Sequence, residues 1–247
     1  MKKLFFVTGT RADFGKLEPL AVAARDQGFD VNFWVTGMHM MERYGLTKIE
    51  VQRVQGVGVS EFSNQYEGDP QDVILAKTVL GFSEFVRDHQ PDLVIVHGDR
   101  IEALACAIVC ATNYTRCAHV EGGEVSGTID ELFRHCNTKL AFCHFVSSHS
   151  AAERVARLGE PKESIYVIGS PELDFHSKPS GVSIEMVRDH YDIPFSDYGI
   201  CTFHPVTSEQ GTMAEQAANL FEALDASGKN FVVILPNNDP GSDDIKI

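Results

Sequence analysis

The sequence lacks the features that would indicate a nucleic-acid-binding, secreted or membrane protein. Its 35 acidic residues outnumber 21 basic ones, which gives a formal net charge of -14, and the lysines and arginines form no cluster. This balance argues against DNA, RNA or an anionic membrane surface as a partner. No apolar run approaches the length of a membrane span, and the first one stops after Val7, too short for a signal peptide. We therefore expect a cytoplasmic protein that binds neither nucleic acid nor membrane.

Patterns typical of metal sites and disulfides are also missing. The six cysteines include no Cys-x-x-Cys pair, and the ten histidines include no His-Glu-x-x-His motif. Neither residue type occurs at the spacing of zinc ligands, so no metal site is predicted. Several cysteines fall in segments predicted to form the core, and reduced, buried thiols are expected.

The first glycine-containing loop matches neither of two common nucleotide-binding motifs. Five residues separate Gly9 from Gly15, and Leu17 stands where a Walker-type loop needs a hydroxyl side chain. Arg11 replaces the second glycine of the dinucleotide motif, so ATP hydrolysis and NAD binding lose their main support. What remains is a strand, a turn, an arginine and a helix N-terminus, which suit an anion or diphosphate. The alternative is that both glycines serve only the turn.

The most informative stretch is a predicted strand-helix-strand unit in the middle of the chain. The apolar run 93–96 predicts a buried parallel strand, the periodicity of 101–112 predicts a helix, and 116–120 predicts a second strand. Asp99 and Glu121 follow the two strands. Because ligands of open α/β sheets bind outside the carboxyl ends of strands, both carboxylates are expected to face one crevice.

Similar units recur on both sides of this stretch, which predicts an α/β fold with a parallel, doubly wound sheet. The further predicted strands are 4–7, 31–35, 49–54, 145–148 and 165–168, the predicted helices are 17–24, 39–44, 75–86, 129–140 and 151–158, and a long loop is predicted at 56–68.

A polar segment rich in proline and glycine predicts a domain boundary, with one Rossmann-like domain at 1–175 and a linker plus second domain at 176–247. The second part predicts a strand at 199–203, a helix at 209–226 and a strand at 231–235. Two strands and a helix are too little for an independent α/β core. We therefore expect a truncated second domain.

Further acidic residues follow the central unit. Asp130 and Arg134 are one helical turn apart, as are Glu131 and His135, so two surface ion pairs are one interpretation. The other is that these carboxylates join Asp99 and Glu121 in one acidic site, where crowding drives pKa values apart as acid–base chemistry requires. Among the histidines, His204 stands out because it follows a predicted strand beside a proline, while core packing is predicted for the others.

Six motifs, in order along the chain, resemble those of the hydrolysing UDP-N-acetylglucosamine 2-epimerases. They are TGTRADFGKL at 8–17, HGDRIEALA at 97–105, HVEGGEVSGTIDELFRH at 119–135, IGSPELD at 168–174, FHP at 203–205 and PNNDPG at 236–241. The resemblance implies two facing Rossmann-like domains, as in GT-B glycosyltransferases, with the nucleotide in the cleft. Members of the family are longer than this chain.

The resemblance also implies a reaction. UDP is eliminated from a UDP-N-acetylhexosamine through a 2-acetamidoglycal, and hydration then gives an N-acetylmannosamine-type sugar used for sialic or related nonulosonic acids. Whether the substrate is UDP-N-acetylglucosamine or a 6-deoxy diacetamido sugar nucleotide stays open. No metal or other cofactor is implied; a UDP-sugar substrate and a homo-oligomer, dimer or tetramer, are expected.

The family's functional residues correspond to positions of this sequence. Its catalytic carboxylates fall on Asp99, Glu121 and Asp130, and Arg134 would neutralise and orient Asp130. Which carboxylate takes the C2 proton stays open. The family's nucleotide contacts fall on Arg11, Arg100, His204 and Asn237. Two alternatives remain: a non-hydrolysing sugar-nucleotide epimerase, and a truncated, catalytically silent fragment.

Overall fold

A computed structural model describes residues 1–177, 179–236 and 241–245 and divides the chain into two compact units, Met1–Lys178 and Pro179–Ile247. The predicted domains, 1–175 and 176–247, differ from these units by three residues at the boundary. Within the described ranges, no helix combines the length and the apolar character needed to cross a membrane.

The first unit is built on a seven-stranded sheet in which every pair of neighbouring strands is parallel. The order across the sheet is β3-β2-β1-β4-β5-β6-β7. The strands are β1 (Lys3–Thr8), β2 (Asp30–Val35), β3 (Gly58–Glu61), β4 (Leu93–His97), β5 (Cys117–Val120), β6 (Cys143–Val146) and β7 (Ile165–Val167).

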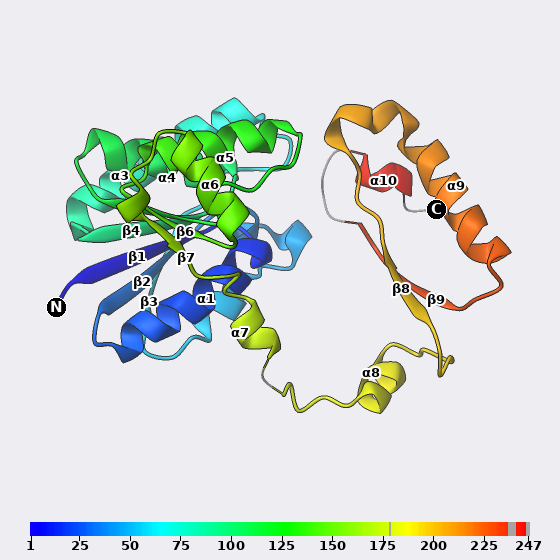
Figure 1. Ribbon diagram of the computed structural model, residues 1–247. Coiled ribbons are helices and arrows are strands. Elements are labelled where there is room, and N and C mark those ends of the chain that lie inside the picture. The colour runs from blue at the N-terminus through cyan, green and yellow to red at the C-terminus, as the bar shows by residue number, and fades with distance from the viewer. Residues whose placement is uncertain (178, 237–240, 246–247) are drawn as a thin grey trace. The chain divides into compact units, whose positions relative to one another are not determined.

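Helices cover both faces of this sheet, as Figure 1 shows, so the predicted parallel, doubly wound α/β fold is confirmed. The α-helices of the first unit are α1 (Arg11–Asp26), α2 (Lys48–Gln52), α3 (Gln71–His89), α4 (Ile101–Thr112), α5 (Ile129–Leu140), α6 (His149–Arg157) and α7 (Leu173–His176). Helices α3 to α6 lie on one face, and α1 and α2 lie on the other. Short 3-10 helices span Gly37–Met40, Glu42–Tyr44 and Lys162–Ser164.

The core forms because alternate strand residues point to opposite faces of a sheet that is covered on both. In β4, Val94 and Val96 join the cluster under α3 and α4, while Ile95 joins the cluster under α1. Trp34 of β2 is 2% exposed and packs against Phe82 of α3 at a ring-centroid distance of 4.8 Å. The six cysteines are free, and three belong to the α3–α4 side of the core, but Cys136 is exposed, so the prediction of buried thiols is correct only in part.

The predicted third strand at 49–54 is wrong, because this segment contains the short helix α2. Val51 is the one fully buried residue of that helix. The prediction mistook an apolar segment with helical spacing for a strand. The third strand is β3, inside the predicted loop 56–68. Its first residue, Gly58, lies so close to Asn32 of β2 that a Cβ there would come within 1.7 Å of the Asn32 side-chain oxygen. Val57 and Val59 alternate with Gly58 and Ser60, but two valines beside a glycine are a weak signal for a strand, which explains the error.

The second unit contains one parallel strand pair, β8 (Gly199–Thr202) and β9 (Phe231–Ile234), joined through α9 (Met213–Ala226). This confirms the predicted strand-helix-strand order, although the first turns of the predicted helix form a separate 3-10 segment, Thr207–Thr212. Met213 and Ala217 of α9 pack on Ile245 of α10 (Ser242–Ile245). Helix α8 (Ile184–His190), which precedes the strands, was not predicted.

Candidate active site

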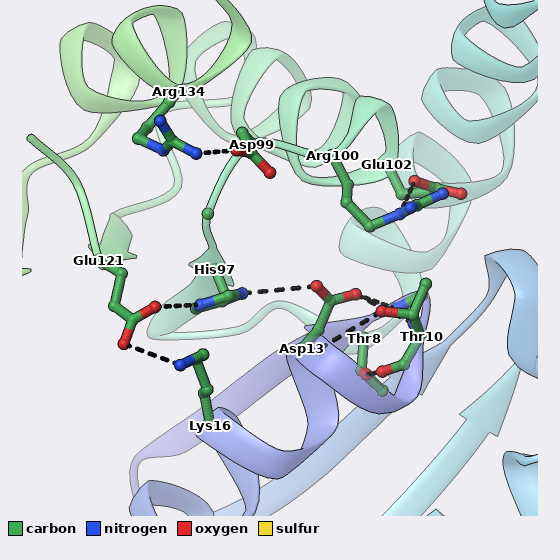
Figure 2. A network of polar contacts seen from close by, with 12 residues as sticks. Thr8, Thr10, Asp13, Lys16, His97, Asp99, Arg100, Glu102, Glu121 and Arg134 are labelled. Atoms are coloured by element: carbon green, nitrogen blue, oxygen red, sulfur yellow. Dashed lines mark hydrogen bonds and ion pairs between the residues drawn. The ribbon is translucent and has the colours of Figure 1, made fainter. Parts of the chain in front are cut away.

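The candidate site lies in the first unit where the strand order reverses. Strands β1 and β4 are neighbours although β2 and β3 separate them in sequence, so the chain leaves their carboxyl ends in opposite directions. Ligands of open α/β sheets bind at such a point. The ends of β1, β4 and β5, with the loops and helices that follow them, carry the polar residues labelled in Figure 2.

Asp99 is placed there by the turn after β4. The strand ends at His97, and Gly98 takes a left-handed conformation, with φ 63°, that a glycine adopts without strain. The Asp99 carboxylate is ion-paired with Arg134 of α5, which is 8% exposed and also donates to the Glu124 carbonyl at 3.1 Å. Burial raises the pKa of Asp99 above its ordinary value despite Arg134. Asp99 is therefore a half-buried carboxyl with increased proton affinity.

The predicted partnership of Arg134 with Asp130 is corrected by these contacts. Arg134 reaches across to the end of β4, whereas the Asp130 carboxylate accepts a hydrogen bond from the Thr128 hydroxyl at 2.8 Å. Asp130 still belongs to the neighbourhood, because its charge is one of the influences that raise the pKa of Asp99. The surface pair between Glu131 and His135 does form, with 3.6 Å between its charged atoms.

Glu121 follows β5 in a similar position but in different surroundings. Its carboxylate accepts from His97 Nε2 at 3.0 Å and from the Ser170 hydroxyl at 2.6 Å, and it lies 3.3 Å from Lys16 Nζ. Burial alone would raise the pKa of Glu121, but these donors outweigh it and lower the pKa to about 2. The backbone of Glu121 is left-handed, with φ 59°, a conformation that costs a non-glycine residue about 1–3 kcal/mol and is concentrated at functional sites.

His97 and Asp13 extend this network to the first loop. His97 Nδ1 lies 3.4 Å from Asp13, whose other oxygen accepts from the backbone N–H groups of Gly9 and Thr10, each at 3.0 Å. The prediction that His97 only packs in the core is therefore wrong. Its position as the last residue of a strand could have indicated the site. For Asp13, the available signal was the capping pattern Thr-x-x-Asp at the start of α1.

Two arginines predicted to bind nucleotide lie at helix N-termini, both near the carboxyl ends of the sheet strands. Arg100 is the N-cap of α4, and its Nε lies 3.2 Å from the buried Glu102 carboxylate. Arg11 is the exposed first residue of α1. Guanidinium groups and helix N-termini both favour anions, so the carboxyl ends of the strands are a suitable place for a diphosphate. His204 follows β8 in the second unit, and Asn237 lies outside the described residues.

The described part of the chain contains no group of three or more His, Cys, Asp or Glu side chains arranged to hold a metal ion. The polar residues of the site instead form alternating acid–base contacts. They include one carboxyl of raised pKa, Asp99, two of lowered pKa, Asp13 and Glu121, and the fixed cations Lys16 and Arg134. Such an arrangement can move a proton beside a bound anion.

A comparison of the sequence with models of protein families shows the family of this chain. Residues 22–247 match the family described as UDP-N-acetylglucosamine 2-epimerase. The chain belongs to the UDP-N-acetylglucosamine 2-epimerase family. The resemblance inferred from the six motifs is thereby confirmed at the level of the family.

Relatives within the 2-epimerase family are similar along nearly the whole chain. It is 44% identical to a UDP-N-acetylglucosamine 2-epimerase of Neisseria meningitidis serogroup B over 99% of its own length, and 33% identical to a UDP-N,N'-diacetylbacillosamine 2-epimerase (hydrolyzing) of Legionella pneumophila over 98%. In each case it spans 65% of the relative.

Solved 2-epimerase structures share the fold. A Neisseria meningitidis UDP-GlcNAc 2-epimerase bound to UDP-GlcNAc superimposes with a TM-score of 0.83 and 16% identity, covering 99% of this chain and 68% of that one. A Listeria monocytogenes protein described as a UDP-N-acetylglucosamine 2-epimerase gives 0.78 and 18%, with coverage of 99% and 66%. At these identities the likeness concerns the fold alone.

Proposed function

We propose that the protein is a hydrolysing 2-epimerase of a UDP-N-acetylhexosamine. In the first step a base takes the proton from C2 of the sugar, the C1–O bond breaks, and UDP leaves with the electron pair, so that a 2-acetamidoglycal forms. In the second step water adds its oxygen to C1 and a proton is delivered to the opposite face of C2. The net reaction consumes one water and yields UDP and an N-acetylmannosamine-type sugar.

The pair of unlike carboxyl groups at the ends of β4 and β5 is the observation that carries this proposal. Asp99 has a raised pKa and suits proton transfer, whereas Glu121 has a pKa of about 2 and stays ionised. We assign the C2 proton to Asp99 on this basis. Asp130, on the first turn of α5, is proposed to assist one of the two steps.

The leaving diphosphate is proposed to bind Arg11 and Arg100. Arg11 is the first residue of α1 and Arg100 is the N-cap of α4. Both lie near the carboxyl ends of the strands, where the carboxylates also lie. Concentrated positive charge stabilises the diphosphate as the C1–O bond breaks, which lowers the barrier to elimination. We propose that His204 and Asn237 also bind the nucleotide.

The hydrolysing form of the reaction is favoured over its non-hydrolysing alternative by the central motif 119–135 and by relatives. The Legionella protein is named as hydrolysing, and a further relative, 29% identical, is the polysialic acid biosynthesis protein P7 of Escherichia coli. A product that enters sialic acid-type synthesis is a free sugar, as water addition would give. We propose the same outcome for this protein.

The test is a product analysis in heavy water. An active form of the protein, incubated with UDP-N-acetylglucosamine or its 6-deoxy diacetamido counterpart, should release UDP and a free mannosamine-type sugar with deuterium at C2. Retention of the sugar on UDP would show a non-hydrolysing epimerase. A free sugar that keeps its original C2 hydrogen would show direct hydrolysis and overturn the proposal.

A further inference from the structure

Three histidines near the carboxyl ends of the strands differ in the chemistry of their partners. His39 lies between two hydroxyl groups, Thr8 at 3.0 Å and Thr47 at 2.7 Å. His119 lies between the Gly98 carbonyl at 2.8 Å and a threonine hydroxyl at 3.1 Å. A hydroxyl either donates or accepts, so a neutral ring with one N–H satisfies both of these arrangements.

His97 has a carboxylate at each ring nitrogen. Nδ1 faces Asp13 at 3.4 Å and Nε2 faces Glu121 at 3.0 Å. An ionised carboxylate only accepts hydrogen bonds, and a neutral imidazole has one N–H to donate. Both contacts are therefore satisfied only when the ring carries two protons or when one carboxyl group carries a proton.

The other contacts of the two carboxyl groups decide between these possibilities. Asp13 accepts from two backbone N–H groups, those of Gly9 and Thr10, at 3.0 Å each. Glu121 accepts from the Ser170 hydroxyl at 2.6 Å and lies 3.3 Å from the Lys16 ammonium. Donors of this kind stabilise the ionised form of each carboxyl group. The extra proton therefore belongs on the ring.

We propose that His97 is an imidazolium that links Asp13 to Glu121, and that it acts as a positioning residue which keeps Glu121 ionised and fixed in the crevice. This assignment rests on the proposed function for the role of Glu121, and on the geometry alone for the charge of His97. Figure 2 shows the resulting line of contacts from the start of α1 across the end of β4 to the end of β5.

The surrounding charges support this assignment. The charged or titratable groups around His97 are Asp13 and Lys16 of α1, His119 and Glu121 at the end of β5, and Asp99 and Arg100 after β4. Burial would lower the pKa of His97, but the hydrogen bonds to Asp13 and Glu121 outweigh it and raise the pKa to about 9. His39 and His119, without carboxylate partners at hydrogen-bond distance, have pKa values lowered by burial to about 4 and about 3.

The consequence for chemistry is a division of roles. An ionised Glu121 held by several donors cannot give a proton to the substrate, so it acts as a fixed negative charge that accepts hydrogen bonds or stabilises positive charge at C1. His97 does not need to contact the substrate for this. Asp13 is the anchor that holds the imidazolium from the opposite side.

The first experiment reads the charge of His97 without any enzyme assay. In the chain labelled with 15N-histidine, NMR should show both ring nitrogens of His97 protonated at pH 7, with the ring losing a proton only near pH 9. His39 and His119 serve as internal controls and should each show one protonated nitrogen at pH 7. A neutral His97 ring at pH 7 would overturn the proposal while leaving the proposed function intact.

The second experiment removes the anchor. Asp13→Asn keeps the size of the side chain and should lower the pKa of His97 by about one unit or more, since one of two carboxylate partners is lost. In an active form, kcat should fall about 10- to 100-fold with little change in KM, the usual effect of losing one charged hydrogen bond. The alkaline fall of kcat should move to lower pH, an effect that a merely structural role would not produce.

Asp92→Asn is the matched control for Asp13→Asn, because it also removes a negative charge that accepts a hydrogen bond from a backbone N–H group. Asp92 accepts from the Lys3 backbone N–H at 2.8 Å at the opposite end of the sheet, so Asp92→Asn should leave both the His97 pKa and the pH profile unchanged. An unchanged pH profile in Asp13→Asn would refute the positioning role. If an active form gave no epimerase reaction at all, the proposed function would fall, and the NMR result would still decide the charge of His97.

Discussion

The ends of β4 and β5 deliver carboxylates in nearly the same way and give them opposite properties. Each strand is followed by a left-handed residue, Gly98 or Glu121, which turns the chain into the crevice. Asp99 is ion-paired with Arg134, but burial raises its pKa. Glu121 meets several donors, which outweigh burial and lower its pKa to about 2. The sheet fixes where a carboxylate lies, and the side chains around it decide whether it holds a proton.

Removing the carboxylates themselves should have the largest effect. We expect Asp99→Asn, Glu121→Gln and Asp130→Asn each to lower kcat by about 10² or more, the usual scale for loss of an acid–base group or of a charge that stabilises the transition state. Steady-state kinetics over a pH range would check this, and the acid-side fall in activity should vanish only with Asp99. Glu131→Gln, next to Asp130 on the same helix but paired with His135, is the control. Near-native turnover in any of the three would remove that residue from the mechanism.

Removing the cation beside Asp99 should have the next largest effect. Arg134→Met leaves a half-buried carboxyl without its partner and a backbone carbonyl without its donor, so the free energy of unfolding should fall by about 2–3 kcal/mol. The pKa of Asp99 should rise further, which moves the acid limb of activity to higher pH. Arg157→Met, an exposed arginine of α6, is the control. A stability equal to that of the control would show that the ion pair contributes little.

The His97 network should make stability depend on pH in the alkaline range. The folded protein holds a proton on His97 up to about pH 9, whereas the unfolded chain releases it near 6.5. The free energy of unfolding therefore falls as pH rises between these values, by at most about 1.4 kcal/mol per unit. Urea denaturation at several pH values would measure it. His97→Gln should flatten the slope, and an equal slope in the variant would assign the effect to another group.

A single donor to Glu121 should have the smallest effect. Ser170→Ala removes the 2.6 Å hydroxyl contact but leaves His97 and Lys16 in place, so kcat should fall only about fivefold to tenfold. Ser177→Ala, at the end of the neighbouring helix α7, is the matched control. A loss as large as that of Glu121→Gln would mean that Ser170 contacts the substrate itself.

The central unit could be predicted from the sequence because its signals are local. A β-branched run predicts β4, one helical face predicts α4, and the rule for strand ends places Asp99 and Glu121 together. The edge strand β3 was missed because its hydrophobic pattern is short, one valine on each side of Gly58, and because the apolar residues of α2 resemble a strand.

The partners within the site could not be predicted for a different reason. Arg134 is one turn from Asp130 in sequence, yet it pairs with Asp99, whose place depends on how α5 packs beside β4. His97 and Asp13 are 84 residues apart and meet only because β1 and β4 are neighbours in the sheet. Spacing along one helix predicts candidates for contact, and the sheet order selects among them.

The place of Trp34 makes the two units distinguishable by fluorescence. It is the single tryptophan of the chain, it is 2% exposed, and it stacks on Phe62 in the core beneath α3. Its emission therefore reports the packing of the first unit, and the second unit has no such reporter. A red shift in emission would therefore report the unfolding of the first unit, which carries Asp99 and Glu121. Unfolding confined to residues after 178 would leave the spectrum unchanged.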